Sequence, residues 1–204
     1  MASVGNLIIP QNHFEAVIFD CDGTVVDSMP AHFEAWCIAL EQHGASGIFG
    51  EDVFYAMGGR PTTDIVEILN NEHNIFLDPM SVAAAKRKAF QESLHKVEII
   101  DEVVEFAQQV KAQGTPTAIA TGGTRLIIEQ TLQAVGINHL FDEVITADDV
   151  VNGKPAPDIF FKCAEVLGAS PSSCLVFEDA PAGMLGAQKA GMQTVIVPAP
   201  FRFG

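Results

Sequence analysis

Two aspartates separated by one residue follow a short apolar run near the start of the chain. Residues 16–19 are apolar, and the chain then continues as Asp-Cys-Asp-Gly-Thr from 20 to 24. An apolar run of this length bounded by turn residues predicts a buried strand, after which Gly23 permits a tight turn. Carboxylates at the carboxyl end of a core strand lie where open α/β sheets bind ligands. Asp20 and Asp22 would be costly side by side unless they share a positive group, and a hard cation such as Mg²⁺ is the simplest candidate.

An Asp-x-Asp pair after a strand is by itself also typical of a solvated turn. The spacing excludes an EF-hand calcium loop, which needs Gly at its sixth place and Glu at its twelfth, because these places hold Val25 and Ala31. Three further groups downstream favour a metal site over a solvated turn.

The first of these groups is Thr121-Gly122-Gly123, directly after the apolar run PTAIA. A hydroxyl and two unhindered backbone N–H groups at the start of a helix form an anion site, and the helix dipole adds to it. The same residues are also typical of a plain threonine N-cap with a glycine turn.

The second group is Gly153-Lys154-Pro155, just before a predicted helix. A lysine between glycine and proline is positioned more rigidly than most, and it can neutralise both a phosphate and the acid that the phosphate meets. The alternative is an exposed loop lysine.

The third group is the acid pair Glu178-Asp179, directly after the apolar run CLVF. It places two more carboxylates at the carboxyl end of a strand, although Asp179 is also a good helix N-cap. Four such groups at one sheet edge are a much rarer coincidence than one. Together they indicate a metal-plus-phosphate site.

Strand and helix patterns alternate from residue 100 onward. Predicted strands cover 116–120, 143–146, 174–177 and 194–197, and predicted helices cover 100–112, 125–135, 157–167 and 182–190. Alternation of this kind implies right-handed crossovers and a parallel sheet. The predicted fold class is therefore α/β, a doubly wound parallel sheet with a Rossmann-like core.

The segment between the first strand and residue 95 shows only helical patterns. Predicted helices cover 31–43 and 62–69 and begin again at Asp78-Pro79, with no strand signal between Val26 and Leu94. We therefore predict a small all-helical cap at 27–95, inserted after the first strand into a core of residues 1–26 and 96–204.

Composition narrows the classes of partner. The 204 residues are 48% apolar, which predicts a globular chain, and the formal net charge of −15 argues against nucleic acid or an anionic membrane surface as a partner. No apolar stretch approaches membrane-spanning length, and the N-terminal residues show no signal-peptide pattern. An anionic substrate would therefore need local positive charge from a metal and a few placed lysines or arginines. The absence of a P-loop motif leaves a kinase unsupported.

The cysteines predict a reducing compartment. Cys21, Cys37, Cys163 and Cys174 have no C-x-x-C spacing and lie in apolar surroundings. We expect reduced, buried thiols in a cytoplasmic protein, which we take to be a monomer.

The motifs D-x-D-G-T, strand-Thr-Gly, G-K-P-x-P-D and E-D-x-x-x-G, in this order and with a helical insertion after the first, resemble the haloacid dehalogenase-like superfamily over essentially the whole chain. The resemblance implies that Asp20 is the nucleophile, which forms an aspartyl-phosphate, and that Asp22 is the general acid and base. It implies that Thr121 and Gly122 hold the phosphoryl group and that Lys154 balances its charge.

The resemblance also implies a cofactor. Mg²⁺ would be held by Asp20, the backbone carbonyl of Asp22 and Asp179, with Glu178 behind or beside Asp179. True haloacid dehalogenases lack an acid at the place of Asp22, so its presence favours phosphoryl transfer.

The helical insertion resembles the cap of the β-phosphoglucomutase and sugar-phosphatase group. His32 would face the active site, Arg60 in the Gly59–Thr62 loop would bind a sugar hydroxyl or phosphate, and one of the lysines around Lys86 would reach the substrate. Each of these residues is also typical of a solvated helix or turn. The loop is more similar to the fructose-1-phosphate phosphatase branch than to the mutase.

The resemblance therefore predicts a Mg²⁺-dependent phosphatase of small sugar phosphates, with a small phosphorylated metabolite as its partner. Two alternatives are a β-phosphoglucomutase, which uses the same aspartyl-phosphate chemistry, and a non-catalytic metal-binding protein. The second would have lost at least one motif residue, and none is lost.

Overall fold

The computed structural model describes residues 2–4, 7–10, 13–58 and 60–198. The chain divides into two compact units, one of residues 1–27 and 98–204 and the other of residues 28–97. The domain boundaries predicted from the sequence, after residues 26 and 95, lie one and two residues earlier than these. They differ because β4 (Val26–Asp27) pairs antiparallel with β5 (Glu98–Ile99), and this pairing keeps both connecting strands in the first unit.

The first unit contains a five-stranded sheet in the order β7-β6-β3-β8-β9, in which all neighbouring strands are parallel. The strands are β3 (Ala16–Phe19), β6 (Thr117–Ala120), β7 (Glu143–Ile145), β8 (Cys174–Glu178) and β9 (Gln193–Ile196). The chain adds β6 and β7 on one side of β3 and then returns to add β8 and β9 on the other. This confirms the predicted doubly wound α/β sheet and places the topological switch point beside β3.

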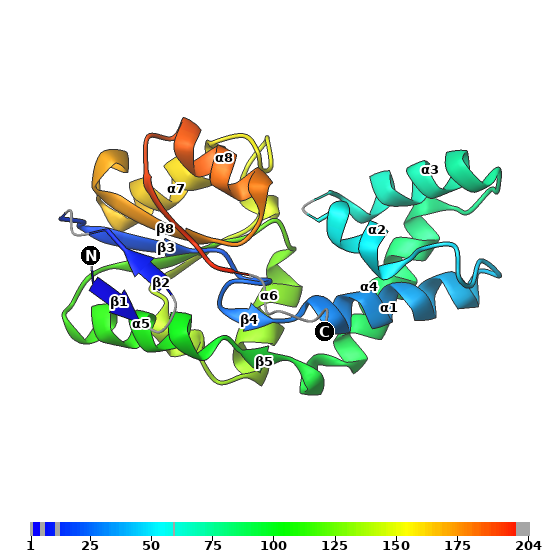
Figure 1. Cartoon of the computed structure of the whole chain (residues 1–204), viewed down its shortest axis with the longest axis horizontal. Helices are drawn as coiled ribbons and strands as arrows, with labels where there is room; N and C mark the ends of the chain where they lie inside the picture. The colour runs from blue at the N-terminus through cyan, green and yellow to red at the C-terminus, as the bar shows by residue number, and fades with distance from the viewer. Residues whose placement is uncertain (1, 5–6, 11–12, 59, 199–204) are drawn as a thin grey trace. The chain divides into compact units, whose positions relative to one another are not determined.

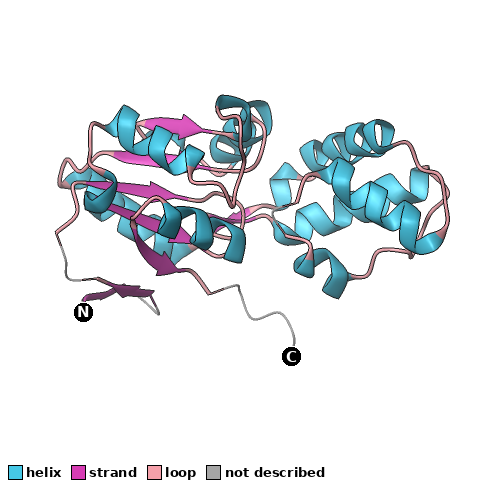
Figure 2. Cartoon of the chain, turned by 90° about the horizontal axis from the view of Figure 1, so that it is seen from above, coloured by secondary structure: helices cyan, strands magenta, loops and turns pink. Residues whose placement is uncertain are grey.

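Four helices cover the two faces of this sheet. Helices α5 (Asp101–Ala112) and α6 (Arg125–Ala134) lie on one face, and α7 (Asp158–Leu167) and α8 (Pro181–Lys189) lie on the other (Figures 1 and 2). Every residue of β3, β6 and β8 is buried, as parallel strands covered on both faces require. On the α5 face, the rings of Phe19 and Phe177 stack with centroids 5.0 Å apart, and Phe106 of α5 lies 4.8 Å from Phe177.

Among its described residues, which exclude Gly59, the second unit contains helices joined by loops and no strand. It consists of α1 (Met29–Gln42), α2 (Glu51–Ala56), α3 (Thr62–His73), α4 (Pro79–Glu92) and the 3-10 helix η1 (Leu94–Lys96). Trp36 of α1 is buried in its core and meets Phe49 edge-on, with centroids 5.1 Å apart. The Asp78 carboxylate accepts the Ser81 N–H at 2.9 Å, so it caps α4 at the predicted start.

Short elements account for most differences from the sequence prediction. Helix α2 has six residues with one buried side chain, Phe54, which is too few to show a helical period. The antiparallel hairpin of β1 (Ala2–Val4) and β2 (Leu7–Ile9) was not predicted, because three residues are too few to show strand alternation.

All four cysteines are free thiols, and Cys21, Cys163 and Cys174 are buried as predicted. The prediction was wrong for Cys37, which is exposed. Helix α1 buries a stripe around Trp36, and position 37 lies about 100° around the helix, past the edge of that stripe. No helix among the described residues is long and apolar enough to cross a membrane.

Candidate active site

Asp20 is fixed at the carboxyl end of the central strand. Its backbone N–H donates to the Phe177 carbonyl at 2.9 Å, which extends the pairing of β3 with β8 by one residue. Its side chain therefore lies at the same sheet edge as Glu178, the last residue of β8. Both carboxylates are buried, with residue exposures of 7% for Asp20 and 1% for Glu178.

The Lys154 ammonium joins three strands at this edge. Its Nζ donates to Asp20 Oδ1 at 2.6 Å, to Glu178 Oε1 at 2.6 Å and to the Ala120 carbonyl at 2.9 Å. A lysine ammonium has three donors, so all of them are used. The side chain is only 9% exposed, which makes this a buried ion cluster and not a surface salt bridge.

Glu178 is enclosed by protein donors. Oε1 accepts from Lys154, and Oε2 accepts the Ala180 N–H at 2.8 Å. A β-carbon built on Gly183 would lie 1.5 Å from Oε1, so only glycine fits at that position of α8. This geometry assigns Glu178 to holding Lys154 in place.

Asp179 lies against the turn that follows Asp20. Thr24 Oγ1 donates to Asp179 Oδ1 at 3.4 Å, and a β-carbon on Gly23 would lie 2.2 Å from Oδ2. The turn is closed by three N–H groups, those of residues 24 to 26, which donate to the Cys21 carbonyl at 3.0 to 3.2 Å. Asp22 lies in this turn, is half-buried and bridges to Val26.

The electrostatics of the cluster favour a cation. Burial raises the pKa of the Asp20 carboxyl well above its usual range, Lys154 opposes this, and Glu178 and Asp179 add to it. Burial and the charge of Glu178 raise the pKa of Asp179 to about 7. Burial alone would lower the pKa of Lys154, but Asp20 and Glu178 overcome this and raise it. The single positive charge of Lys154 is thus set against three carboxyl groups, those of Asp20, Glu178 and Asp179.

Oxygen atoms of Asp20, Glu178 and Asp179 lie within 4.8 Å of one another, which is suitable spacing for a metal site. Carboxylate oxygens are the ligands that Mg²⁺ prefers. The residues present therefore fit the predicted cation, both in donor type and in their excess of negative charge.

The predicted phosphate loop follows β6. Thr121 is buried, its N–H donates to the Ile145 carbonyl at 3.0 Å, and its Oγ1 accepts the Gly123 N–H at 3.1 Å. This corrects the expectation that both glycine amides are unhindered, since that of Gly123 is already engaged. Helix α6 begins at Arg125, and its N-cap is Thr124. Thr121 is therefore not the N-cap of this helix. Gly122 is exposed.

Two of the three predicted cap residues come together within the helical unit. His32 Nδ1 lies 3.1 Å from Lys86 Nζ, and the imidazole stacks on Phe90 with centroids 3.8 Å apart. Lys86 is half-buried. Arg60 is exposed, and its N–H donates to the Met57 carbonyl at 3.2 Å.

The adjoining Arg87 and Lys88 are both exposed. Burial and the contact with His32 therefore distinguish Lys86 from the other two residues of the basic run.

Thr24 and Gly183 were not predicted from the sequence to contribute to this site. Thr24 belongs to the D-x-D-G-T motif, so its signal was present, but only the structure shows the hydroxyl directed at Asp179. Gly183 also belongs to a motif, but only the structure shows that a side chain at this position would collide with Glu178.

The chain is similar to known proteins over most of its length. Residues 14–191 match the haloacid dehalogenase-like hydrolase family. The chain is 35% identical over 188 residues to the fructose-1-phosphate phosphatase YqaB of Escherichia coli, covering 90% of this chain and 96% of that protein. It is 30% identical over 185 residues to the phosphorylated carbohydrates phosphatase of Thermotoga maritima, covering 89% and 83%. A putative β-phosphoglucomutase of Thermotoga maritima has the same fold, with a TM-score of 0.71, 28% identity, and coverage of 88% and 83%.

Proposed function

Because this chain belongs to the haloacid dehalogenase-like hydrolase family and is a phosphoric monoester hydrolase, we propose that it hydrolyses small sugar phosphates, of the fructose 1-phosphate type, with Mg²⁺ as its cofactor. The observation that carries this proposal is the Lys154 ammonium, 2.6 Å from Asp20 beside two further acids. The similarity to a fructose-1-phosphate phosphatase over most of both chains supports the substrate class.

In the first half of the reaction, an oxygen of Asp20 attacks phosphorus while the bond from phosphorus to the sugar oxygen breaks. Asp22 gives its proton to the departing sugar oxygen, so a neutral sugar leaves and an aspartyl-phosphate remains. In the second half, Asp22 takes a proton from water and the water oxygen attacks phosphorus while the bond from phosphorus to the Asp20 oxygen breaks. Inorganic phosphate is released and the Asp20 carboxylate is restored.

Three residues support these steps. Thr121 and Gly122 bind oxygens of the transferring group through the hydroxyl and the backbone N–H. Lys154 offsets the negative charge shared by Asp20 and the phosphoryl oxygens.

Mg²⁺ would be held by Asp20, Asp179 and the carbonyl of Asp22, with Glu178 behind them because protein donors engage both of its oxygens. When bound, the cation offsets repulsion between the anionic nucleophile and the anionic substrate.

We assign substrate selection to His32, Lys86 and Arg60 in the helical unit. Two cationic or hydrogen-bonding side chains 3.1 Å apart, His32 and Lys86, suit an anionic, hydroxyl-rich ligand. We further propose that the protein is a cytoplasmic monomer. Its free thiols support a reducing compartment.

The test is an endpoint assay with Mg²⁺ on fructose 1-phosphate and β-glucose 1-phosphate, the latter with glucose 1,6-bisphosphate as primer. We expect phosphate release from fructose 1-phosphate and little glucose 6-phosphate. Rapid glucose 6-phosphate formation without phosphate loss would instead identify a mutase. Asp20→Asn should abolish turnover, and Asp101→Asn, which changes an exposed aspartate of α5, is the matched control.

A further inference from the structure

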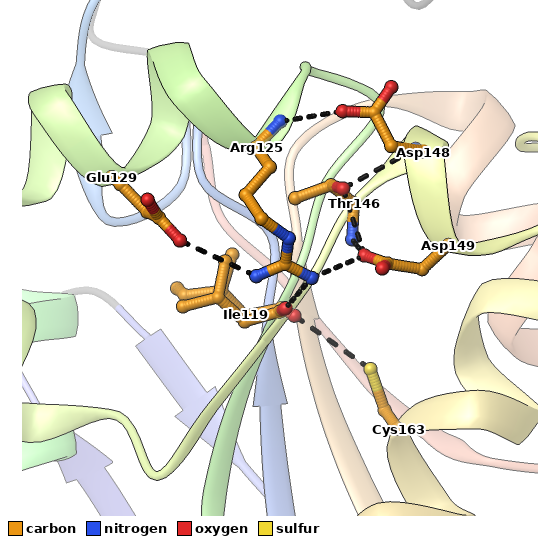
Figure 3. A network of polar contacts seen from close by, with 8 residues as sticks. Ile119, Arg125, Glu129, Thr146, Asp148, Asp149 and Cys163 are labelled. Atoms are coloured by element: carbon orange, nitrogen blue, oxygen red, sulfur yellow. Dashed lines mark hydrogen bonds and ion pairs between the residues drawn. The ribbon is translucent and has the colours of Figure 1, made fainter.

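A polar network beside the active site joins the two loops that carry Thr121 and Lys154. It is centred on Arg125, the first residue of α6, and on the 3-10 helix η3 (Ala147–Asp149), which follows β7 (Figure 3). Arg125 lies three residues after Gly122, and Asp149 lies five residues before Lys154.

One carboxylate oxygen holds the network together. Asp149 Oδ2 accepts the Thr146 N–H at 2.8 Å, the Thr146 hydroxyl at 2.9 Å and Arg125 Nη2 at 2.7 Å. The hydrogen bond from the Thr146 N–H belongs to a capping box, which fixes η3 directly after β7. The hydrogen bond to Arg125 is charge-assisted at both ends, a type about twice as strong as a neutral one.

Further hydrogen bonds extend this link to the phosphate loop. Arg125 Nη2 also donates to the Val144 carbonyl at 3.0 Å, and the Arg125 backbone N–H donates to Asp148 Oδ2 at 2.9 Å. The Ala147 N–H donates to the Gly123 carbonyl at 3.3 Å. The loop from Thr121 to α6 is therefore tied to η3 at both its middle and its end.

We propose that Asp149 is a positioning residue for phosphoryl transfer, which fixes the Thr121–Gly122 loop relative to Lys154 through Arg125. This inference rests on the proposed function, because it assigns those two loops to one phosphoryl group. Without the carboxylate charge, the loops keep their folds but lose their fixed spacing.

The chain contains a matched control for this carboxylate. Asp142 accepts the Thr117 N–H at 2.9 Å, the Thr117 hydroxyl at 3.2 Å and the Lys111 ammonium, and thus also has three donors, one of them cationic. Asp142 precedes β7 and Thr117 begins β6, so this cluster lies at the amino end of the sheet, away from the site. Asp149→Asn and Asp142→Asn therefore remove similar interactions from opposite edges.

The experiment compares both variants with the wild type in melting temperature, in kcat and KM for fructose 1-phosphate, and in calorimetric binding of inorganic phosphate with Mg²⁺. We expect both to lower the melting temperature similarly. We expect only Asp149→Asn to lower kcat, by about 10- to 100-fold, and to weaken phosphate binding, since small misplacements of reacting groups have effects of this order. Glu129→Gln, which removes the 3.5 Å ion pair on the other side of Arg125, should change none of these.

Wild-type kcat and phosphate binding in Asp149→Asn would overturn the inference and leave Asp149 a structural residue. So would an equal loss of kcat in Asp142→Asn. A wild type that binds phosphate but hydrolyses no sugar phosphate would refute the proposed function alone, because the binding comparison still tests Asp149. A wild type that binds no phosphate would refute both.

Discussion

Gly23 lies so close to Asp179 that a β-carbon on the glycine would lie 2.2 Å from Oδ2 of the aspartate. Gly23 also has a φ of +86°, in the left-handed region that residues with side chains rarely adopt. The first motif and the fourth are therefore in contact through a glycine, with no space between them. This contact holds the Asp179 carboxylate against the turn that carries Asp22.

Gly23→Ala should abolish most of the activity, because the new methyl group must displace Asp179 or the turn itself. We expect kcat to fall on the order of 100-fold, the effect typical of a small misplacement in an active site. Gly114→Ala is the matched control, since Gly114 has a similar φ of +78° but a β-carbon added there would meet nothing within 4 Å. Both variants should lose about 1–2 kcal/mol of stability to backbone strain, but only Gly23→Ala should lose activity. Full activity in Gly23→Ala would show that this contact does not matter.

Lys154→Met should destabilise the fold as well as inactivate the enzyme. It leaves Asp20 and Glu178 buried without their common counter-ion, and breaking a buried ion pair in this way costs about 3–5 kcal/mol. Urea unfolding of Lys154→Met, of Glu178→Gln and of the double variant tests this. We expect the double variant to be less destabilised than the sum of the two single variants, because the neutral amide of Glu178→Gln removes one unpaired charge. Strict additivity would mean that Lys154 and Glu178 are not energetically coupled.

Mg²⁺ binding should release a proton and strengthen with pH, because the pKa of Asp179 is raised to about 7 in the metal-free protein and the ligand must be ionised. One proton lost near pH 7 predicts affinity about tenfold higher at pH 8 than at pH 6. Calorimetry at both values in buffers of different ionisation enthalpy measures affinity and proton release. Equal affinity with no proton released would remove Asp179 from the ligand set.

The raised pKa of Asp179 also makes the metal-free protein less stable as the pH rises. Asp179 keeps its proton in the folded state up to about pH 7 but loses it near pH 4 when the chain is unfolded. The free energy of unfolding therefore falls as the pH rises from about 4 to about 7. The raised pKa of Asp20 acts in the same direction. Urea unfolding in EDTA at pH 5 and pH 8 should give a lower free energy at pH 8 for the wild type and a smaller difference for Asp179→Asn.

Much of the core was predictable because three of the four motifs directly follow an apolar run bounded by turn residues. The apolar runs ending at Phe19 and Phe177 specify buried parallel strands, and a parallel sheet brings their carboxyl ends to one edge. The acids that follow must then be neighbours, whatever the details of packing. The same reasoning anticipated Lys154, although its simultaneous contact with Asp20 and Glu178 required the structure.

Features that depend on contact distance could not be predicted in this way. The requirement for glycine at Gly183 comes from its approach to Glu178, which no local pattern encodes. The Arg125–Asp149 ion pair joins residues 24 positions apart, and only the capping box at Thr146 had a sequence signature. The exposure of Cys37 was missed because the apolar stripe of α1 is narrower than the residue types imply.

Lys86→Met should impair the use of sugar phosphates more than it impairs chemistry on a generic substrate. A lost hydrogen bond to a charged group is worth about 1.5–3 kcal/mol, which predicts a fall in kcat/KM for fructose 1-phosphate of roughly 10- to 100-fold. Hydrolysis of p-nitrophenyl phosphate, which lacks the sugar, should change much less. Lys88→Met is the matched control, since Lys88 lies two residues along the same helix and is exposed, whereas Lys86 is half-buried and 3.1 Å from His32. Equal effects of the two variants would mean that the basic run acts only through its summed charge, and that the contact with His32 does not select the substrate.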